Sequence, residues 1–318
     1  QLLHEELKVE YAAKRQYHQD RLTSRKLLSI EQSRQNKSKI DWQGYSITQP
    51  SFEGIRIFDN VDIENLLSYI DWTPFFSSWE LAGSFPKILD NKLVGESASK
   101  LYQDALVMLQ KISHEKWLTA KAVVGFFPAN SINDDIEIYQ SEDRSTAQYQ
   151  LHHLRQQLDR TNDRPNYCLS DFIAPKATGI KDYIGCFAVT AGIGIEQHIK
   201  EFEADHDDYS AIMLKALADR LAEALAEYLH QLVRKELWGY ASDELFNNEQ
   251  LIKEKYQGIR PAPGYPACPD HTEKQTLWAM LEPDKHIGLN LTESFAMYPT
   301  AAVSGWYFSH PEARYFGV

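Results

Sequence analysis

Cysteines, long apolar runs and an excess of positive charge are all missing or scarce in this 318-residue sequence. Its three cysteines, Cys168, Cys186 and Cys268, lie far apart and form no Cys-x-x-Cys pair, which argues against a disulfide framework or a cysteine-based zinc site. This usage is typical of a reducing setting, so we expect a cytoplasmic protein. The longest uncharged apolar stretches, residues 183–195 and 294–309, are shorter than the ~20 residues that cross a bilayer, and we predict no transmembrane helix.

The charge is acidic overall and unevenly distributed. The chain has 33 Lys and Arg against 45 Asp and Glu, a net charge of −12, which argues against nucleic-acid or membrane partners. Residues 1–40 carry nine basic and five acidic side chains (+4), which leaves 24 against 40 (−16) in residues 41–318. Residues 1–40 also lack proline and glycine and have few apolar side chains, so we predict a solvated helical linker followed by one domain over 41–318. Because the first residue is Gln1, we expect a piece of a longer polypeptide.

The common catalytic motifs are also absent from the sequence. The stretch from Gly192 to Glu196 lacks the third glycine of a dinucleotide-binding loop, and no Gly-x-Ser-x-Gly elbow or P-loop occurs. His152 and His153 have no partner at the spacing of metal ligands. We therefore predict neither a catalytic residue nor a metal site in this chain.

Hydrophobic periodicity predicts helices over residues 62–70, 95–111 and 204–238, the first capped by Asp62 and ended by Pro74. Residues 122–139 contain two strand-like runs, expected to form a hairpin around a turn at 128–133. Further strand-like runs cover 167–172, 183–190, 293–297 and 303–308. Helices and strands do not alternate regularly, so we predict an α+β fold: a mixed, largely antiparallel bent sheet with flanking helices, preceded by the helical linker.

Residues 258–274, GIRPAPGYPACPDHTEK, form the least ordinary segment. Its prolines stiffen an extended path, and Gly264 allows a close approach to the main chain. Arg260 offers a planar fork for a carboxylate or phosphate, and Tyr265 and His271 follow within a short reach. We interpret the segment as a preorganised wall for a small polar ligand that lies outside the core. The alternative is a proline-rich surface loop whose Arg260 pairs with a nearby acid.

The Arg-x-x-x-Gly-Tyr pattern of residues 260–265, followed by PACP at 266–269, resembles the S-adenosylmethionine signature of the activation domain of cobalamin-dependent methionine synthase. The similarity extends in order from about Asp41 to the end of the chain. Other similar stretches are IDWTPFF (70–76), FPAN (127–130), DDIEIY (134–139), NYCL (166–169) with DF (171–172), HDDY (206–209), KALADRLAEA (215–224) and TESFAM (292–297). The family's domain normally continues past Val318, so the resemblance implies a truncated C-terminus.

The resemblance implies an S-adenosylmethionine site formed by Asp71, Glu223, Arg260, Pro261, Ala262, Gly264, Tyr265, Tyr315 and Phe316. Arg260 suits the ligand's carboxylate, and Asp71 its ammonium or ribose. Tyr315 and Phe316 suit its adenine. From the residues alone, Asp71 can equally make a local helix-terminal bond, Glu223 can be solvated, and the aromatic pair can belong to the core.

Three residues are candidates to face a neighbouring cobalamin-binding module: Asp219, Tyr265 and His271. Ala218, Ala222 and Ala226 recur every four residues and give the helix that carries Asp219 a smooth stripe for docking. The alternatives are local hydrogen bonding by Tyr265 and His271, and packing of the alanine stripe within the domain.

The family's function, as the resemblance implies it, is reactivation. The parent enzyme transfers a methyl group from 5-methyltetrahydrofolate through cobalamin to homocysteine, and its zinc and cobalamin lie in other modules. The domain binds S-adenosylmethionine for the reductive methylation of inactive cob(II)alamin, with one electron from a flavodoxin-type partner. Such a donor is usually acidic, so we expect a local basic docking patch near the linker, and binding that weakens with salt. The alternative hypotheses for the function are a noncatalytic clamp for the cobalamin module and a free-standing methyltransferase.

Overall fold

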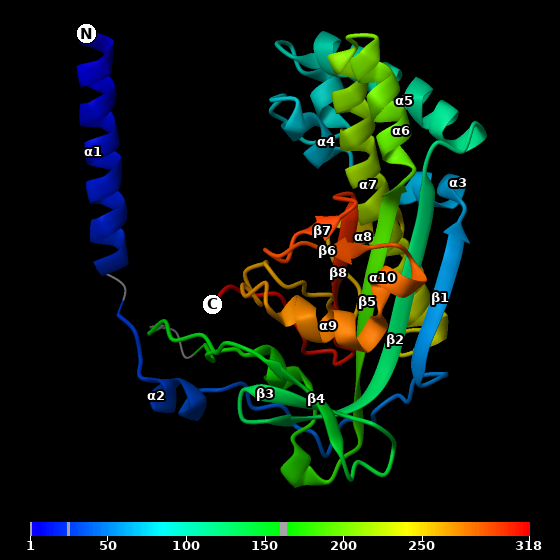
Figure 1. Cartoon of the computed structure of the whole chain (residues 1–318). Helices are drawn as coiled ribbons and strands as arrows, with labels where there is room; N and C mark the ends of the chain where they lie inside the picture. Colours follow the sequence, from blue (N-terminus) through cyan, green and yellow to red (C-terminus); the bar gives the residue numbers. More distant parts are fainter. Residues whose placement is uncertain (1, 24–25, 160–163) are drawn as a thin grey trace.

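The computed structural model describes residues 2–23, 26–159 and 164–318 (Figure 1). A six-stranded sheet forms its centre, in the order β4-β3-β2-β5-β8 with β1 also paired to β2, and every strand pair is antiparallel. The strands are β1 Gly54–Val61, β2 Thr119–Ile132, β3 Asp135–Tyr139, β4 Ala147–His152, β5 Asp182–Ile193 and β8 Ala302–Tyr307. This sheet and its flanking helices confirm the predicted α+β fold.

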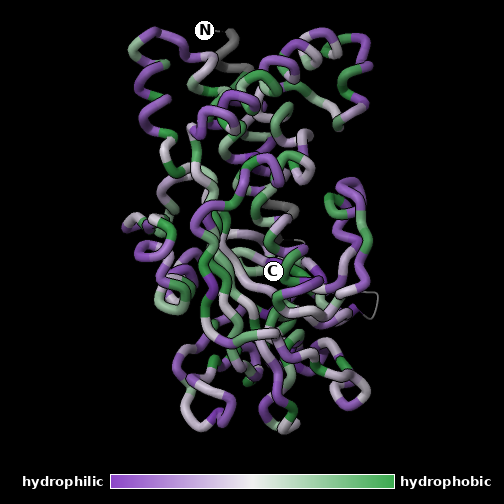
Figure 2. Tube along the Cα trace, turned by 90° about the vertical axis from the view of Figure 1, so that its right-hand side faces the viewer, coloured by the Kyte–Doolittle hydropathy of each residue, from purple (hydrophilic) through white to green (hydrophobic). Residues whose placement is uncertain are grey.

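Side chains that alternate along the strands bury both faces of the sheet. On one face, Val124 and Phe187 belong to a core with α7, Asp208–Leu232. On the other, Val123 and Cys186 pack in a second core with α9, Glu273–Leu281. Figure 2 shows the hydrophobic residues gathered along these central elements. Around α7 lie α3 Ile63–Leu66, α4 Thr73–Ser78, α5 Gly95–His114 and α6 Ile195–Ala204; the remaining elements are α8 Asn248–Ile252, α10 Pro283–His286, β6 Asn290–Leu291 and β7 Met297–Tyr298.

The predicted helices exist, but two of their ends differ. The Asp62 side chain accepts a hydrogen bond from the Glu64 amide, as expected, and a short 3₁₀ turn then ends this helix by Tyr69. Pro74 does not end it: the proline lies in the first turn of α4, where its missing N–H costs no helical bond. The long helix predicted over 204–238 is present as α7 and the π-helical turn Val233–Leu237, but it begins only at Asp208, because the Asp207 side chain caps it through the Ser210 amide. The preceding helix α6, which ends at Ala204, was not predicted.

The strand predictions needed three corrections. β2 runs straight through the predicted turn at 128–133 and turns only after Ile132. On the edge of β2 that faces β1 and β3, β1 pairs with β2 only as far as Phe126, and β3 pairs with it only from Ala129. Pro128 therefore lies opposite neither of these strands, and a residue without an N–H is tolerated there. Residues 169–172 form a 3₁₀ turn rather than a strand, and of 293–297 only Met297 enters a strand, β7.

The linker contains two helices, α1 Leu2–Thr23 and α2 Ile30–Gln35. Figure 1 shows α1 standing apart from the domain, whereas α2 lies against the β3–β4 end of the sheet. Among the described residues, no helix is both long enough and apolar enough to cross a lipid bilayer.

Candidate functional site

A cavity of about 470 Å³ opens where α7, the 254–267 segment, β8 and the C-terminal tail meet. This size suits a small-molecule ligand. It is lined by Glu223, Glu254, Arg260, Pro261, Ala262, Tyr265, Pro266, Ala267, Val303, Tyr315 and Phe316. The structure therefore brings together seven of the nine residues expected to bind S-adenosylmethionine.

The loop that walls this cavity is fixed against β8. The Ile259 and Phe308 main chains exchange two hydrogen bonds, and the Trp306 amide donates to the Pro261 carbonyl at 3.0 Å. Gly305 makes this approach possible, because a Cβ there would lie 2.4 Å from the Pro261 oxygen. Ile259 is buried along with Ala267 and Cys268, so the expectation that the loop lies outside the core is wrong.

Gly264 occupies a tight turn within the loop. Its φ of +98° is a conformation that favours glycine, and an added Cβ would lie 2.2 Å from the His271 ring. Its amide donates to the Cys268 carbonyl at 2.8 Å. Gly264 thus shapes the wall without lining the cavity itself.

Arg260 is paired with an acid, as the alternative interpretation expected, and it also lines the cavity. Its side chain is 18% exposed, and Nη1 donates to Glu227 Oε2 at 2.6 Å and to the Tyr256 hydroxyl at 2.9 Å. Across the described part of the chain, Nε and Nη2 of Arg260 have no hydrogen-bond partner. One edge of the guanidinium is therefore available to an anionic group.

The aromatic pair of the tail closes one side of the cavity. The Tyr315 hydroxyl accepts a hydrogen bond from the Arg260 amide at 3.0 Å, which ties the tail to the loop. The Phe316 ring packs 5.7 Å from Tyr167 and 6.4 Å from Phe172, between ring centres. Phe316 thus lines the cavity and also joins the second core.

Asp71 does not line this cavity. Its carboxylate accepts a hydrogen bond from the Thr73 amide at 2.9 Å, at the start of α4.

Asp219, Tyr265 and His271 are exposed, so all three are accessible to another module. The alanine stripe of α7, in contrast, is buried: Ala218, Ala222 and Ala226 are at most 1% exposed and pack within the domain.

Several functional-site residues escaped the sequence analysis. Glu254, Pro266, Ala267 and Val303 line the cavity, and nothing in their local pattern distinguishes them from ordinary loop or strand residues. Behind Arg260, Glu227 and His230 are buried on α7, and Arg234 is buried in the helical turn that continues it. Their spacing of three and four residues places these polar side chains on one helical face, a signal that was readable from the sequence.

A larger cavity of about 930 Å³ lies between the linker, the β2–β3 turn and the segment 153–158 that follows β4. Its arginines, Arg34 and Arg155, are already paired with Asp134, and Arg155 also with Asp171. The candidate ligand site is therefore the smaller cavity, which contains seven of the nine expected residues.

The fold and the cavity together define an α+β domain with a cavity of small-molecule size, walled by a loop that carries an arginine. A family profile described as the activation domain of vitamin B12 dependent methionine synthase matches residues 62–318, so the chain belongs to this family. A solved structure described as the MetH reactivation domain bound to AdoHcy is 55% identical in sequence, with a TM-score of 0.89. The match covers 92% of this chain and 89% of that one.

Proposed function

We propose that this domain binds S-adenosylmethionine in the 470 Å³ cavity and presents its methyl group for the reactivation of cobalamin. One observation carries the proposal: the free guanidinium edge of Arg260 at a cavity in a chain 55% identical to a domain solved with AdoHcy.

The residues present suit the chemical groups of this ligand. The free Nε and Nη2 of Arg260 match a carboxylate through two parallel hydrogen bonds. The carboxylates of Glu223 and Glu254 suit the ammonium, and the Tyr315 and Phe316 rings suit the adenine. Asp71 remains a proposed acceptor for the ammonium or ribose on the family resemblance alone.

The proposed role is one of positioning. When bound, S-adenosylmethionine supplies an activated methyl group, so the chain needs no acid or base of its own. The exposed Asp219, Tyr265 and His271 would face the cobalamin-binding module of the same polypeptide. The proposal also includes a flavodoxin-type electron donor, and a parent enzyme that makes methionine from homocysteine and 5-methyltetrahydrofolate in the cytoplasm, with zinc in another module.

Isothermal titration of the chain with S-adenosylmethionine tests the binding site. We expect one-to-one binding that Arg260→Ala weakens by about 2 to 4 kcal/mol, because the ligand's carboxylate loses its partner. Arg260→Lys keeps the charge beside Glu227 but loses the planar fork, so it should weaken binding by an intermediate amount. Arg56→Ala, at an exposed arginine on β1, is the matched control.

Two outcomes would contradict this assignment. Unchanged affinity in both Arg260 variants would place the ligand's carboxylate elsewhere. Absence of binding by the folded wild-type chain would favour the alternative function, a noncatalytic clamp for the cobalamin module.

A further inference from the structure

A chain of alternating charges runs from the protein interior to the cavity. Arg234, fully buried, pairs through Nε with Glu244 at 2.7 Å and through Nη2 with Glu227 at 3.5 Å. Glu227, 9% exposed, pairs in turn with Arg260 at 2.6 Å. Two acids and two arginines therefore alternate, and Arg260 is the member that reaches the cavity.

Neighbouring aromatic groups fix the geometry of this chain. The Tyr256 ring lies 4.0 Å from the Arg234 guanidinium, and its hydroxyl accepts from Arg260 Nη1. His230 Nδ1 lies 3.3 Å from the same Nη1. Burial, and then Arg234 and Arg260, hold the pKa of His230 well below its usual value, so this ring is neutral and accepts the hydrogen bond.

A π-helical turn at the end of α7 places Arg234 within this cluster. Residues Val233–Leu237 form a π-helical turn, in which the Trp238 amide donates to the Val233 carbonyl at 2.9 Å. Such turns occur frequently at functional sites. Here the π-helical turn begins next to Arg234. The ion pair with Glu244 holds Arg234 in place, and Arg234 contacts Oε1 of Glu227 while Arg260 contacts Oε2.

We propose that Glu227 is a positioning residue for recognition of the ligand's carboxylate. An arginine side chain has many rotamers, and a flexible guanidinium loses entropy when it binds. Glu227 holds Nη1 of Arg260, so the Nε and Nη2 edge is presented to the cavity before the ligand arrives. Glu227 itself does not line the cavity. This inference rests on the proposed function.

The test compares two ligands that differ in the amino-acid part. S-adenosylhomocysteine carries the carboxylate, whereas 5′-methylthioadenosine has the same nucleoside and thioether without it. By isothermal titration of the 318-residue chain, Glu227→Ala should weaken S-adenosylhomocysteine binding about tenfold or more, and 5′-methylthioadenosine binding less than about twofold. Glu227→Gln keeps the shape of the side chain and one acceptor, so it should show a smaller loss of affinity with the same selectivity between the two ligands. It replaces the alanine variant in the test if that variant does not fold.

The controls separate positioning from stability. Glu236→Ala removes an exposed acid beyond the end of α7 and should change neither affinity. In the Arg260→Ala background, Glu227→Ala should cost less than about a further twofold, because the two residues act as one unit.

Three results would overturn the inference: equal losses for both ligands, no loss for either, or additive losses in the double variant. A wild-type chain that binds neither ligand would overturn the proposed function itself, and the two failures are thus distinguishable.

Discussion

At the scale of single residues, His153 is a buried histidine that lies near an aromatic ring. It is 6% exposed, its ring centre lies 6.4 Å from that of Phe308, and neither ring nitrogen has a hydrogen-bond partner among the described residues. Burial, with a smaller effect of His152, lowers its pKa from 6.5 to about 3. The unfolded chain binds this proton near pH 6.5, so stability is present above that pH and is lost as the pH falls toward 3.

His153→Phe should therefore make the domain less sensitive to acid. Between pH 7 and pH 4, the unfolding free energy of the wild type should fall by about 3 kcal/mol more than that of the variant. Urea denaturation at each pH measures this difference. His152→Gln, at the exposed neighbour, should keep the wild-type slope. Parallel curves for wild type and His153→Phe would show that other groups cause the acid sensitivity.

The sequence predicted residues that stand out chemically but not those that support them. Arg260 was identifiable because it lies in a proline-rich loop with Gly264, and a ligand wall needs that combination. Glu227 shares one helical face with His230 and Arg234, which the sequence spacing shows, but its ion pair with Arg260 on a distant loop is not visible in the sequence. Asp71 was predicted by family resemblance, and the structure places its carboxylate on the Thr73 amide instead of in the cavity.

At the scale of elements, the contact between the binding loop and β8 depends on one glycine. Gly305→Ala would place a methyl group 2.4 Å from the Pro261 carbonyl and should force the loop away from the strand. We expect a stability loss of about 1 to 3 kcal/mol and weaker S-adenosylmethionine binding. Denaturation and titration measure the two effects. Ser304→Ala is the control, because within the described ranges of the chain this buried neighbour has no hydrogen-bond partner for its hydroxyl. A variant with wild-type stability and affinity would show that the loop has room to move.

Elements were predicted well where local pattern decides, and poorly where distant pairing decides. The apolar spacing of 95–111 was sufficient to predict α5, and Asp62 to predict a cap. Pro128 can lie within a strand because β1 and β3 do not pair with β2 at that position. The sequence around Pro128 contains no information about where these other strands end. The start of α7 follows from the Asp207 cap, which the apolar periodicity alone did not reveal.

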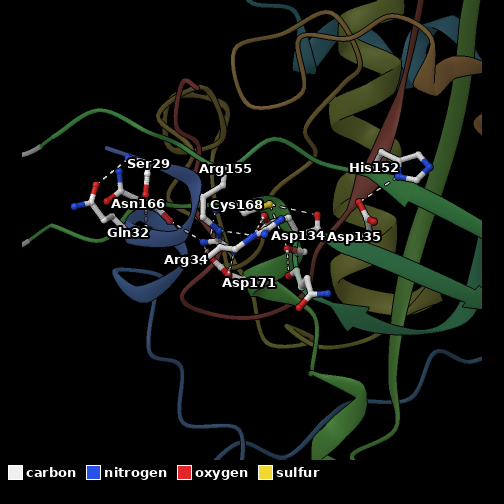
Figure 3. Close-up of polar contacts among 12 residues, drawn as sticks. Ser29, Gln32, Arg34, Asp134, Asp135, His152, Arg155, Asn166, Cys168 and Asp171 are labelled. Atoms are coloured by element: carbon white, nitrogen blue, oxygen red, sulfur yellow. Dashed lines mark hydrogen bonds and ion pairs between the residues drawn. The ribbon is translucent and has the colours of Figure 1, made fainter. Parts of the chain in front are cut away.

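At the scale of the whole molecule, the linker is attached to the domain by a few specific bonds (Figure 3). The Leu28 amide donates to the Gln157 carbonyl at 2.7 Å, and Arg34 Nε pairs with Asp134 at 2.8 Å. Asp134 also accepts from Arg155, whose side chain is 1% exposed and which forms two further bonds to Asp171. An exposed arginine of the linker thus shares an acid with a buried one.

Because Asp134 pairs with both arginines, we expect substitutions of Arg34 and of Asp134 to change the stability by different amounts. Arg34→Ala should change global stability by less than about 1 kcal/mol, because Arg34 is half exposed, at 50%. Asp134→Ala should cost more, about 2 to 3 kcal/mol, since it leaves the buried Arg155 with one partner fewer. Hydrogen exchange should show faster exchange of residues 26–36 in Arg34→Ala while β5 keeps its protection. Unchanged protection of 26–36 would mean that main-chain bonds such as that of Leu28 are sufficient to hold the linker, and that the ion pair is incidental to its position.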